Sequence, residues 1–221
     1  MASTFNRDIY QVVTTALSEL TEAQASGRVP RTPLSEAHFL GRWITQALKL
    51  HRFSRTTVEQ LKAWQQQSRS RGKGAELTPL FRQIQAWYGA LLTVDDGGTA
   101  MAPVQKPQLA ALLEEMVTLD WQVETTYPVR GPCHHHSEGR SSLVVCADAL
   151  SSAFEGEGTL AVPLSLYARG EVSVLIARAY QQGLLLHKVS DYRALVKYHG
   201  EYRLYPDNAG PMLAELPALI A

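Results

Sequence analysis

Residues 171–206 constrain the fold more than any other part of the chain, because they carry its one clear supersecondary pattern. The first part of this segment has apolar residues at the spacing i, i+3, i+4 and i+7, namely Val172, Leu175, Ile176 and Ala179. That spacing is typical of a short amphipathic helix. Gly183 is the residue type preferred just after a helix C-terminus, so the helix is predicted to end there.

A β-hairpin is predicted directly after this helix. Two short segments with apolar or aromatic residues, 193–198 and 201–205, flank the dipeptide His199-Gly200. Glycine readily adopts the positive φ of a tight hairpin turn, so Gly200 is predicted to form the turn. Together with residues 149–170, which would supply two earlier helices, the helix and hairpin resemble the C-terminal part of a winged-helix domain. The resemblance covers about a third of the chain and implies a three-helix core with a β-wing, a fold that binds DNA or docks proteins.

Residues 1–120 show helical periodicity in five separate places. Each place has apolar side chains spaced for burial along one helix face, and the predicted helices cover residues 9–20, 35–48, 58–64, 79–92 and 109–117. Ser35 is predicted to cap the second of them. Residues 68–74 are rich in Ser, Arg and Gly and are predicted to form a mobile basic loop. Apolar helix faces of this kind can be buried only against one another. We therefore expect a helical bundle domain over residues 1–120.

From residue 121 onward the pattern changes to short β-branched and alternating runs, such as 121–127 and 143–146. These runs predict strands around a long turn. The segment 159–167 alternates like a strand, whereas the winged-helix resemblance requires a helix there, and the sequence leaves both open. Residues 121–221 are therefore predicted to form a small α+β domain of winged-helix type. The fold class expected for the whole chain is α+β and mostly helical.

The charge of the chain is balanced overall but uneven along its length. Lys and Arg total 21, as do Asp and Glu, which argues against a generally basic nucleic-acid-binding coat. Up to position 82, however, there are 12 basic and 6 acidic residues. Three of these cations, Arg42, Lys49 and Arg52, fall on or beside the polar face of the second predicted helix. Positive charge is therefore concentrated in the first helices.

The sequence carries no signal for membrane insertion or secretion. No apolar run approaches the roughly 18 residues of a membrane helix, and the first residues lack the layout of a secretory signal. The 2 cysteines do not make a disulfide framework. We therefore expect a soluble, cytoplasmic protein.

Cys133 is followed directly by His134, His135 and His136, and further along by Cys146, which is the densest set of metal-capable side chains. Thiolate and imidazole are preferred zinc ligands. There is no paired C-x-x-C, however, and adjacent histidines on an extended chain point in opposite directions. The cluster is interpreted as a solvated turn, with a zinc-dependent enzyme or zinc-stapled fold as an alternative. Neither G-x-S-x-G nor H-E-x-x-H occurs, so no catalytic residue, metal ligand or cofactor is assigned.

Basic side chains from two parts of the chain are predicted to contact nucleic-acid phosphates. They are Arg69, Arg71, Lys73, Arg178, Lys188, Arg193, Lys197 and Arg203. The predicted recognition helix offers only Ser173, Arg178 and Gln181 as polar side chains on its free face, which is too few to read bases. We therefore expect a non-catalytic nucleic-acid-associated or adaptor subunit that contacts the backbone. The alternative is a protein–protein interaction subunit of a larger complex.

Overall fold

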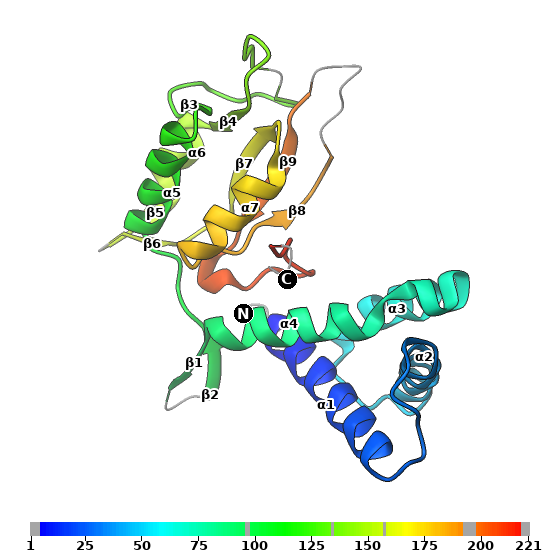
Figure 1. Ribbon diagram of the computed structural model, residues 1–221. Coiled ribbons are helices and arrows are strands. Elements are labelled where there is room, and N and C mark those ends of the chain that lie inside the picture. Colours follow the sequence, from blue (N-terminus) through cyan, green and yellow to red (C-terminus); the bar gives the residue numbers. More distant parts are fainter. Residues whose placement is uncertain (1–4, 96–97, 134, 157, 192–197, 218–221) are drawn as a thin grey trace. The chain divides into compact units, whose positions relative to one another are not determined.

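The computed structural model describes residues 5–95, 98–133, 135–156, 158–191 and 198–217 (Figure 1). The chain divides into two compact units, Ser3–Ala100 and Met101–Ala221, which we call the helical unit and the sheet unit. The fold class is α+β and mostly helical, as predicted. Within the described ranges, no helix combines the length and the apolar character that a membrane crossing demands.

The helical unit is an arrangement of amphipathic helices around one core. Its described helices are α1 (Phe5–Ala25), α2 (Pro33–Lys49), α3 (Val58–Arg71) and α4 (Leu77–Leu91), with the 3-10 turns η1 (Arg55–Thr57) and η2 (Gly72–Ala75) on either side of α3 and the two-stranded sheet β1 (Leu92–Asp95) and β2 (Gly98–Met101) after α4. α1 packs against α4, and α2 packs against α3. Ile9, Leu40, Trp64 and Phe81, one from each helix, are at most 1% exposed. The first four predicted helices therefore form a bundle.

The start of α2 differs from the prediction by a few residues. Ser35, the predicted cap, lies inside the helix, and Thr32 is the N-cap residue. Thr32 Oγ1 accepts a hydrogen bond from the Ser35 backbone N–H at 3.3 Å. Pro33 occupies the first turn, where its missing N–H would have had no helical partner.

The prediction of a mobile basic loop at residues 68–74 is wrong. α3 continues to Arg71, and η2 completes the segment. Gln67 Nε2 donates a hydrogen bond to the carbonyl oxygen of Ala75 at 2.7 Å. Because the side chain of Ala75 is only 1% exposed, this turn is attached to the core at its end. Arg69 is therefore held on a helix rather than on a loop.

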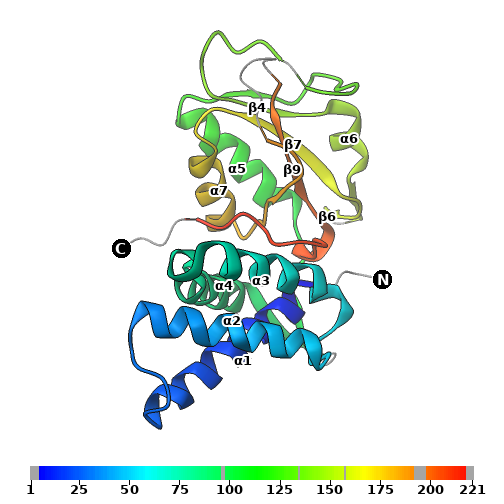
Figure 2. The same cartoon turned by 90° about the vertical axis from the view of Figure 1, so that its right-hand side faces the viewer.

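The sheet unit contains a five-stranded mixed sheet with strand order β3-β4-β7-β9-β8. The strands are β3 (Gln122–Glu124), β4 (Ser142–Val145), β7 (Leu164–Arg169), β8 (His187–Lys188) and β9 (Gly200–Leu204). β3 and β4 run parallel, and the other neighbours are antiparallel. Helices α5 (Lys106–Thr118) and α7 (Val172–Gln181) lie side by side over the sheet (Figure 2). The remaining elements are α6 (Ala147–Ser152), β5 (Phe154–Glu155), β6 (Thr159–Leu160) and η4 (Pro206–Asn208).

Helix α5 belongs to the sheet unit, although the sequence places it in the bundle over residues 1–120. Leu109 and Leu112 share one hydrophobic core with Leu143 and Leu166 of the sheet. The chain accordingly divides near residue 100. An apolar stripe shows that a helix is buried on one face but does not say against which partner.

The predicted hairpin turn at His199-Gly200 is wrong. Gly200 is the first residue of β9 and pairs with Ala168 of β7. The neighbour of β9 at the edge of the sheet is β8, and there His187 pairs with Arg203. The first strand of the hairpin was predicted at residues 193–198. Of this range only residue 198 is described, so this part of the prediction stays untested.

Residues 149–170 do not supply the two helices that a winged-helix domain requires. The end of α6, the β5–β6 pair and strand β7 occupy this range, so 159–167 is mainly extended. Leu164, Leu166 and Ala168 are buried and alternate with half-buried residues, as expected for a strand with one face on a core. The predicted helix at 172–181 is confirmed as α7, and Gly183 follows it with φ +74°. The winged-helix type itself is not confirmed.

Candidate nucleic-acid interface

In the sheet unit, the described side chains that were predicted to contact phosphates are paired with carboxylates. Each of the three that the structure describes has a carboxylate partner: Arg178 Nη1 lies 3.1 Å from Glu115 Oε1, Lys188 Nζ 2.6 Å from Asp191 Oδ1, and Arg203 Nη2 2.5 Å from Glu201 Oε1. Arg193 and Lys197 lie outside the described residues. Paired charges attract a phosphate less than free ones do, so the described part of this unit gives little support to a phosphate-binding wing.

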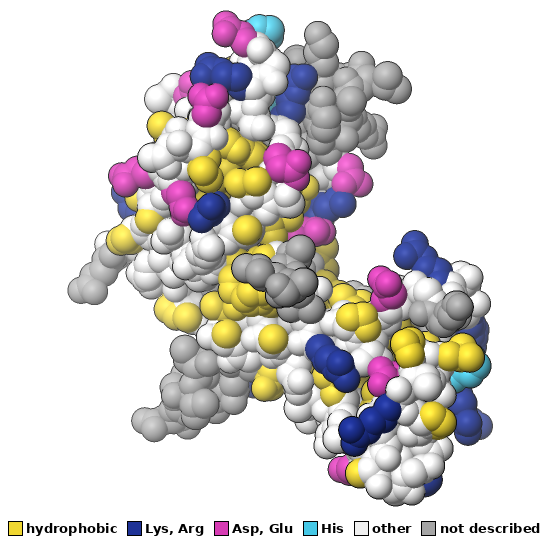
Figure 3. Space-filling model, viewed as in Figure 1, with side chains coloured by type: hydrophobic (Ala, Val, Ile, Leu, Met, Phe, Trp, Pro, Cys, Tyr) yellow, Lys and Arg dark blue, Asp and Glu magenta, His cyan; other side chains and the backbone are white. Residues whose placement is uncertain are grey.

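A groove between α2 and α3 in the helical unit is the strongest candidate site. Its volume is about 750 Å³, and we call it the cationic groove. It is lined by His38, Gly41, Arg42, Thr45, Gln46, Lys49, Leu50, Gln65, Ser68 and Arg69. No carboxylate is among these residues. In the space-filling view, Lys and Arg side chains gather over the part of the helical unit that contains α2 and α3 (Figure 3).

The floor of the cationic groove is set by a close approach of the two helices. A Cβ atom at Gly41 would overlap Ser68 Oγ in its present rotamer, so the two helices approach closely at this point. Gln65 Nε2 donates a hydrogen bond across the helices to Thr45 Oγ1 at 3.0 Å. These interactions hold the groove walls at a fixed separation.

Three cations project from the groove walls: Arg42 and Lys49 from α2, and Arg69 from α3. In the described part of the chain none of the three forms a salt bridge. Arg42 and Lys49 are seven residues apart, two helical turns, which places them on one face about 10 Å apart along the axis. A row of uncompensated cations at this spacing favours an extended anion.

Of the basic residues predicted at positions 69–73, the structure brings only Arg69 into the groove. Arg71 is exposed and does not line it, and the side chain of Lys73 lies outside the described residues. The prediction did not assign His38 or Gln46 to a site, although polar residues at helical spacing opposite the apolar stripe of α2 were a usable signal.

A second pocket adjoins the cationic groove along α2. It has a volume of about 540 Å³, and we call it the aromatic pocket. It shares His38, Arg42 and Gln46 with the groove and is otherwise lined by Glu19, Ala23, Arg28, Val29, Pro30, Ser35, Phe39 and Trp43. The two recesses therefore form one continuous surface, and the part beyond Arg42 adds the aromatic side chains Phe39 and Trp43.

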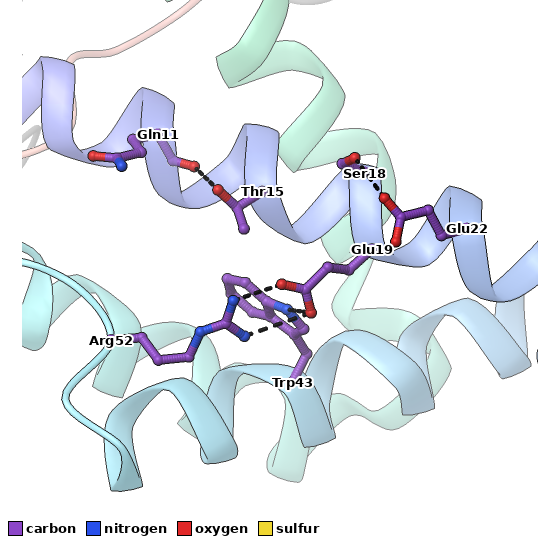
Figure 4. Close-up of polar contacts among 7 residues, drawn as sticks. All are labelled: Gln11, Thr15, Ser18, Glu19, Glu22, Trp43 and Arg52. Carbon is purple, nitrogen blue, oxygen red and sulfur yellow. Dashed lines mark hydrogen bonds and ion pairs between the residues drawn. The ribbon is translucent and has the colours of Figure 1, made fainter.

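The acidic residue of the aromatic pocket, Glu19, is already engaged (Figure 4). Arg52 Nη2 donates to Glu19 Oε1 at 2.6 Å, and Trp43 Nε1 donates to Glu19 Oε2 at 2.7 Å. The hydrogen bond from Arg52, together with that from Trp43, holds the pKa of Glu19 below its ordinary value. The Arg52 guanidinium also lies 5.3 Å from the centroid of the Trp43 ring. Glu19 is therefore neutralised locally and fixes the orientation of the indole.

The cysteine and histidine residues near position 133 do not converge on a metal site within the described residues. No group of three His, Cys, Asp or Glu side chains there could hold an ion, and His134 lies outside the described residues. Cys133 is 2% exposed, and burial raises the pKa of its thiol. Cys146 has a lowered pKa because the backbone N–H of Ala149 hydrogen-bonds to its sulfur. The two thiols thus lie in different environments.

Ser142 and His199 form a buried pair in the sheet unit. Ser142 Oγ lies 2.7 Å from His199 Nε2, and His199 Nδ1 lies 3.2 Å from the carbonyl oxygen of Cys133. A carbonyl only accepts, so Nδ1 carries the proton and Nε2 accepts from the serine hydroxyl. This resembles the pairing of a nucleophile with a base. Ser142 is 0% and His199 4% exposed, however, so the pair is enclosed in the sheet unit and we interpret it as structural.

Replacing Ser142 with Ala is expected to lower the free energy of unfolding of the sheet unit by about 1–3 kcal/mol, because it leaves a buried ring nitrogen without this partner. Chemical denaturation measures the loss. Ser173→Ala, on the exposed side of α7, serves as the control and should change the free energy by less than about 0.5 kcal/mol, because the hydrogen bond that its hydroxyl donates to Glu171 is exposed to water. Equal effects of the two substitutions would show that the buried pair contributes nothing.

Comparison with known proteins identifies a family for this chain but no individual relative. A family model described as a protein of unknown function (DUF2913) matches residues 4–217. No curated protein and no solved structure matches the chain.

Proposed function

The chain belongs to this family, DUF2913, and we propose that its helical unit binds the phosphate backbone of a nucleic acid through the cationic groove. The observation that supports this most directly is that Arg42, Lys49 and Arg69 line a groove without a carboxylate and form no salt bridge with any residue that the structure describes. The whole chain has a net charge of +0. The attraction is therefore local to this groove and does not come from a general basic coat.

The neutral side chains of the groove also suit phosphate oxygens. Ser68 offers a hydroxyl and Gln46 an amide, and such groups commonly bind phosphate next to Arg and Lys. Backbone interactions of this kind carry no sequence information. We therefore expect binding that depends on salt and is nearly independent of sequence.

The double variant Arg42→Gln, Arg69→Gln tests this function. We expect its affinity for a labelled mixed-sequence DNA, measured by fluorescence anisotropy, to fall roughly 50-fold at about 0.1 M salt. The slope of log affinity against log salt should fall by roughly 0.7–0.9 for each phosphate that the variant no longer neutralises. These values follow from counterion release and do not require a change in fold, which circular dichroism would check.

Arg31→Gln, Arg55→Gln is the matched control, because both residues are exposed on the same unit and neither lines the groove. It removes the same charge and should leave affinity within a few-fold of the wild type. An equal loss in both double variants would point to general electrostatics, and no loss in either would contradict nucleic-acid binding at this site. Binding of poly-glutamate as tightly as DNA would favour an acidic protein partner and the adaptor alternative.

A further inference from the structure

We propose that the nucleic acid is single-stranded, and that one unstacked base enters the aromatic pocket while its flanking phosphates lie on the cationic groove. This inference rests on the proposed function and names its ligand class. The pocket and the groove share Arg42, so a phosphate bound there would have a base within reach in the aromatic pocket and further phosphates along the groove.

The walls of the aromatic pocket suit a flat, partly apolar ring. Phe39 is half-buried, so part of its ring faces the pocket. Trp43 lies one turn further along α2 on the same side of the helix, but its ring is only 5% exposed, so it supports the pocket from below and Phe39 offers the stacking face. Val29 and Pro30 add apolar surface from the loop between α1 and α2. A volume of about 540 Å³ lies in the range of small-molecule sites and exceeds what a single base needs.

The Trp43 side of the aromatic pocket is held by a hydrogen bond, and the one carboxylate among the described residues that line the pocket, Glu19, is paired. The Trp43 indole is fixed by its 2.7 Å hydrogen bond to Glu19 and is only 5% exposed. Glu19 is neutralised by Arg52 at 2.6 Å, so it does not repel a neighbouring phosphate. Arg28 lines the same pocket and forms no salt bridge in the part of the chain that the structure describes. A second phosphate could therefore bind there, beyond the base.

A duplex cannot use this pocket without being opened. Its bases are stacked and paired, so their faces are covered, whereas single strands present unstacked bases that stack readily on aromatic side chains. Such stacking accepts any base, because every base has a π-face. The combination of a salt-dependent groove and an aromatic pocket thus favours single strands over duplexes without strong sequence preference.

The test compares a 12-nucleotide single strand, its duplex and an abasic strand with the same number of phosphates, using the full chain and fluorescence anisotropy. We expect the single strand to bind at least tenfold more tightly than the other two. Phe39→Leu, which retains apolar volume without a π-face, should weaken single-strand binding roughly 5- to 150-fold, the range found for one base stacked on an aromatic ring. It should leave the salt slope and the affinities for duplex and abasic strand unchanged, while Phe39→Tyr should retain binding.

The outcomes separate this inference from the proposed function. Equal affinity for all three probes, with no effect of Phe39→Leu but a loss in Arg42→Gln, Arg69→Gln, would overturn the single-strand inference and leave phosphate binding in place. No loss in the arginine variant would overturn both. If Phe39→Leu weakened all three probes equally, the ring would support only the shape of α2, and the inference would again fail.

Discussion

Replacing Trp43 with Ala is expected to lower the free energy of unfolding of the helical unit by about 3–5 kcal/mol. The ring is 5% exposed on α2 and lies 5.6 Å from the ring of Phe53, so its removal leaves a cavity. The substitution also removes the hydrogen bond to Glu19 and the surface over which the Arg52 guanidinium lies. Hydrogen exchange at increasing denaturant, read from peptides of α1–α4, measures the stability of this unit separately.

Trp43→Phe separates packing from hydrogen bonding. It retains most of the ring but lacks the indole N–H, so we expect a loss of about 1–2 kcal/mol, smaller than that of the alanine variant. Glu19 would still accept from Arg52, which limits the cost. A loss below about 1 kcal/mol for Trp43→Ala would mean that the ring contributes little to the core, contrary to its burial.

The helices of the chain were predictable because their buried residues recur at the helical period within a short stretch of sequence. In α1, Ile9, Val12 and Val13 recur at the helical period and are all 0% exposed. α7 was equally clear, since its stripe is followed directly by Gly183. A repeat of this kind needs no knowledge of the rest of the fold.

Strand pairing was not predictable, because it depends on residues far apart in the chain. The sequence around Gly200 has the composition of a tight turn, yet this glycine pairs with Ala168 inside the sheet. For the same reason the sequence could not show that α5 buries its stripe against strands that follow it. Local patterns indicate that a segment is buried but leave its partner undetermined.

The candidate site was predictable only in part. The basic character of the first helices is visible in composition, and Arg69 was among the predicted phosphate contacts. The groove itself depends on the close approach of Gly41 to Ser68, which joins two helices. The ion pair between Arg178 and Glu115 could not be read from the sequence either, since the two residues belong to different helices. Free and paired cations look alike in a sequence.

Acidification from pH 7 to pH 4 is expected to remove about 3 kcal/mol of folding free energy from the sheet unit through His187 alone. Burial lowers the pKa of His187 from 6.5 to about 4 in the folded protein. The unfolded chain therefore takes up the proton first, near pH 6.5, while the folded protein resists it until about pH 4. The two pKa values differ by about 2.5, and each unit is worth about 1.4 kcal/mol. Stability is thus full above pH 6.5 and is lost as the pH falls towards 4.

The structural reason for this shift is that His187 is enclosed, so its charged form would lose its contact with water. It is 0% exposed, and its Nδ1 lies 2.9 Å from the Met212 carbonyl oxygen, which must accept, so Nδ1 carries the hydrogen. Nε2 has no hydrogen-bond partner among the described residues, and Gly210 packs so closely against the ring that a Cβ atom there would overlap it. A proton on Nε2 would therefore be buried without an acceptor.

The variant His187→Asn isolates this contribution, because an asparagine amide can still donate to Met212 O but does not titrate. Carboxylates such as Glu124, whose pKa is held below its ordinary value by the hydrogen bond from the Thr126 hydroxyl, also weaken as the pH falls. The informative quantity is therefore the difference in unfolding free energy between wild type and variant, followed by urea denaturation from pH 7 to pH 4. We expect the wild type to lose about 3 kcal/mol relative to the variant over this range. Parallel curves would show that His187 is protonated as easily in the folded protein as in the unfolded chain, and its enclosure by Gly210 and Met212 would then carry no electrostatic cost.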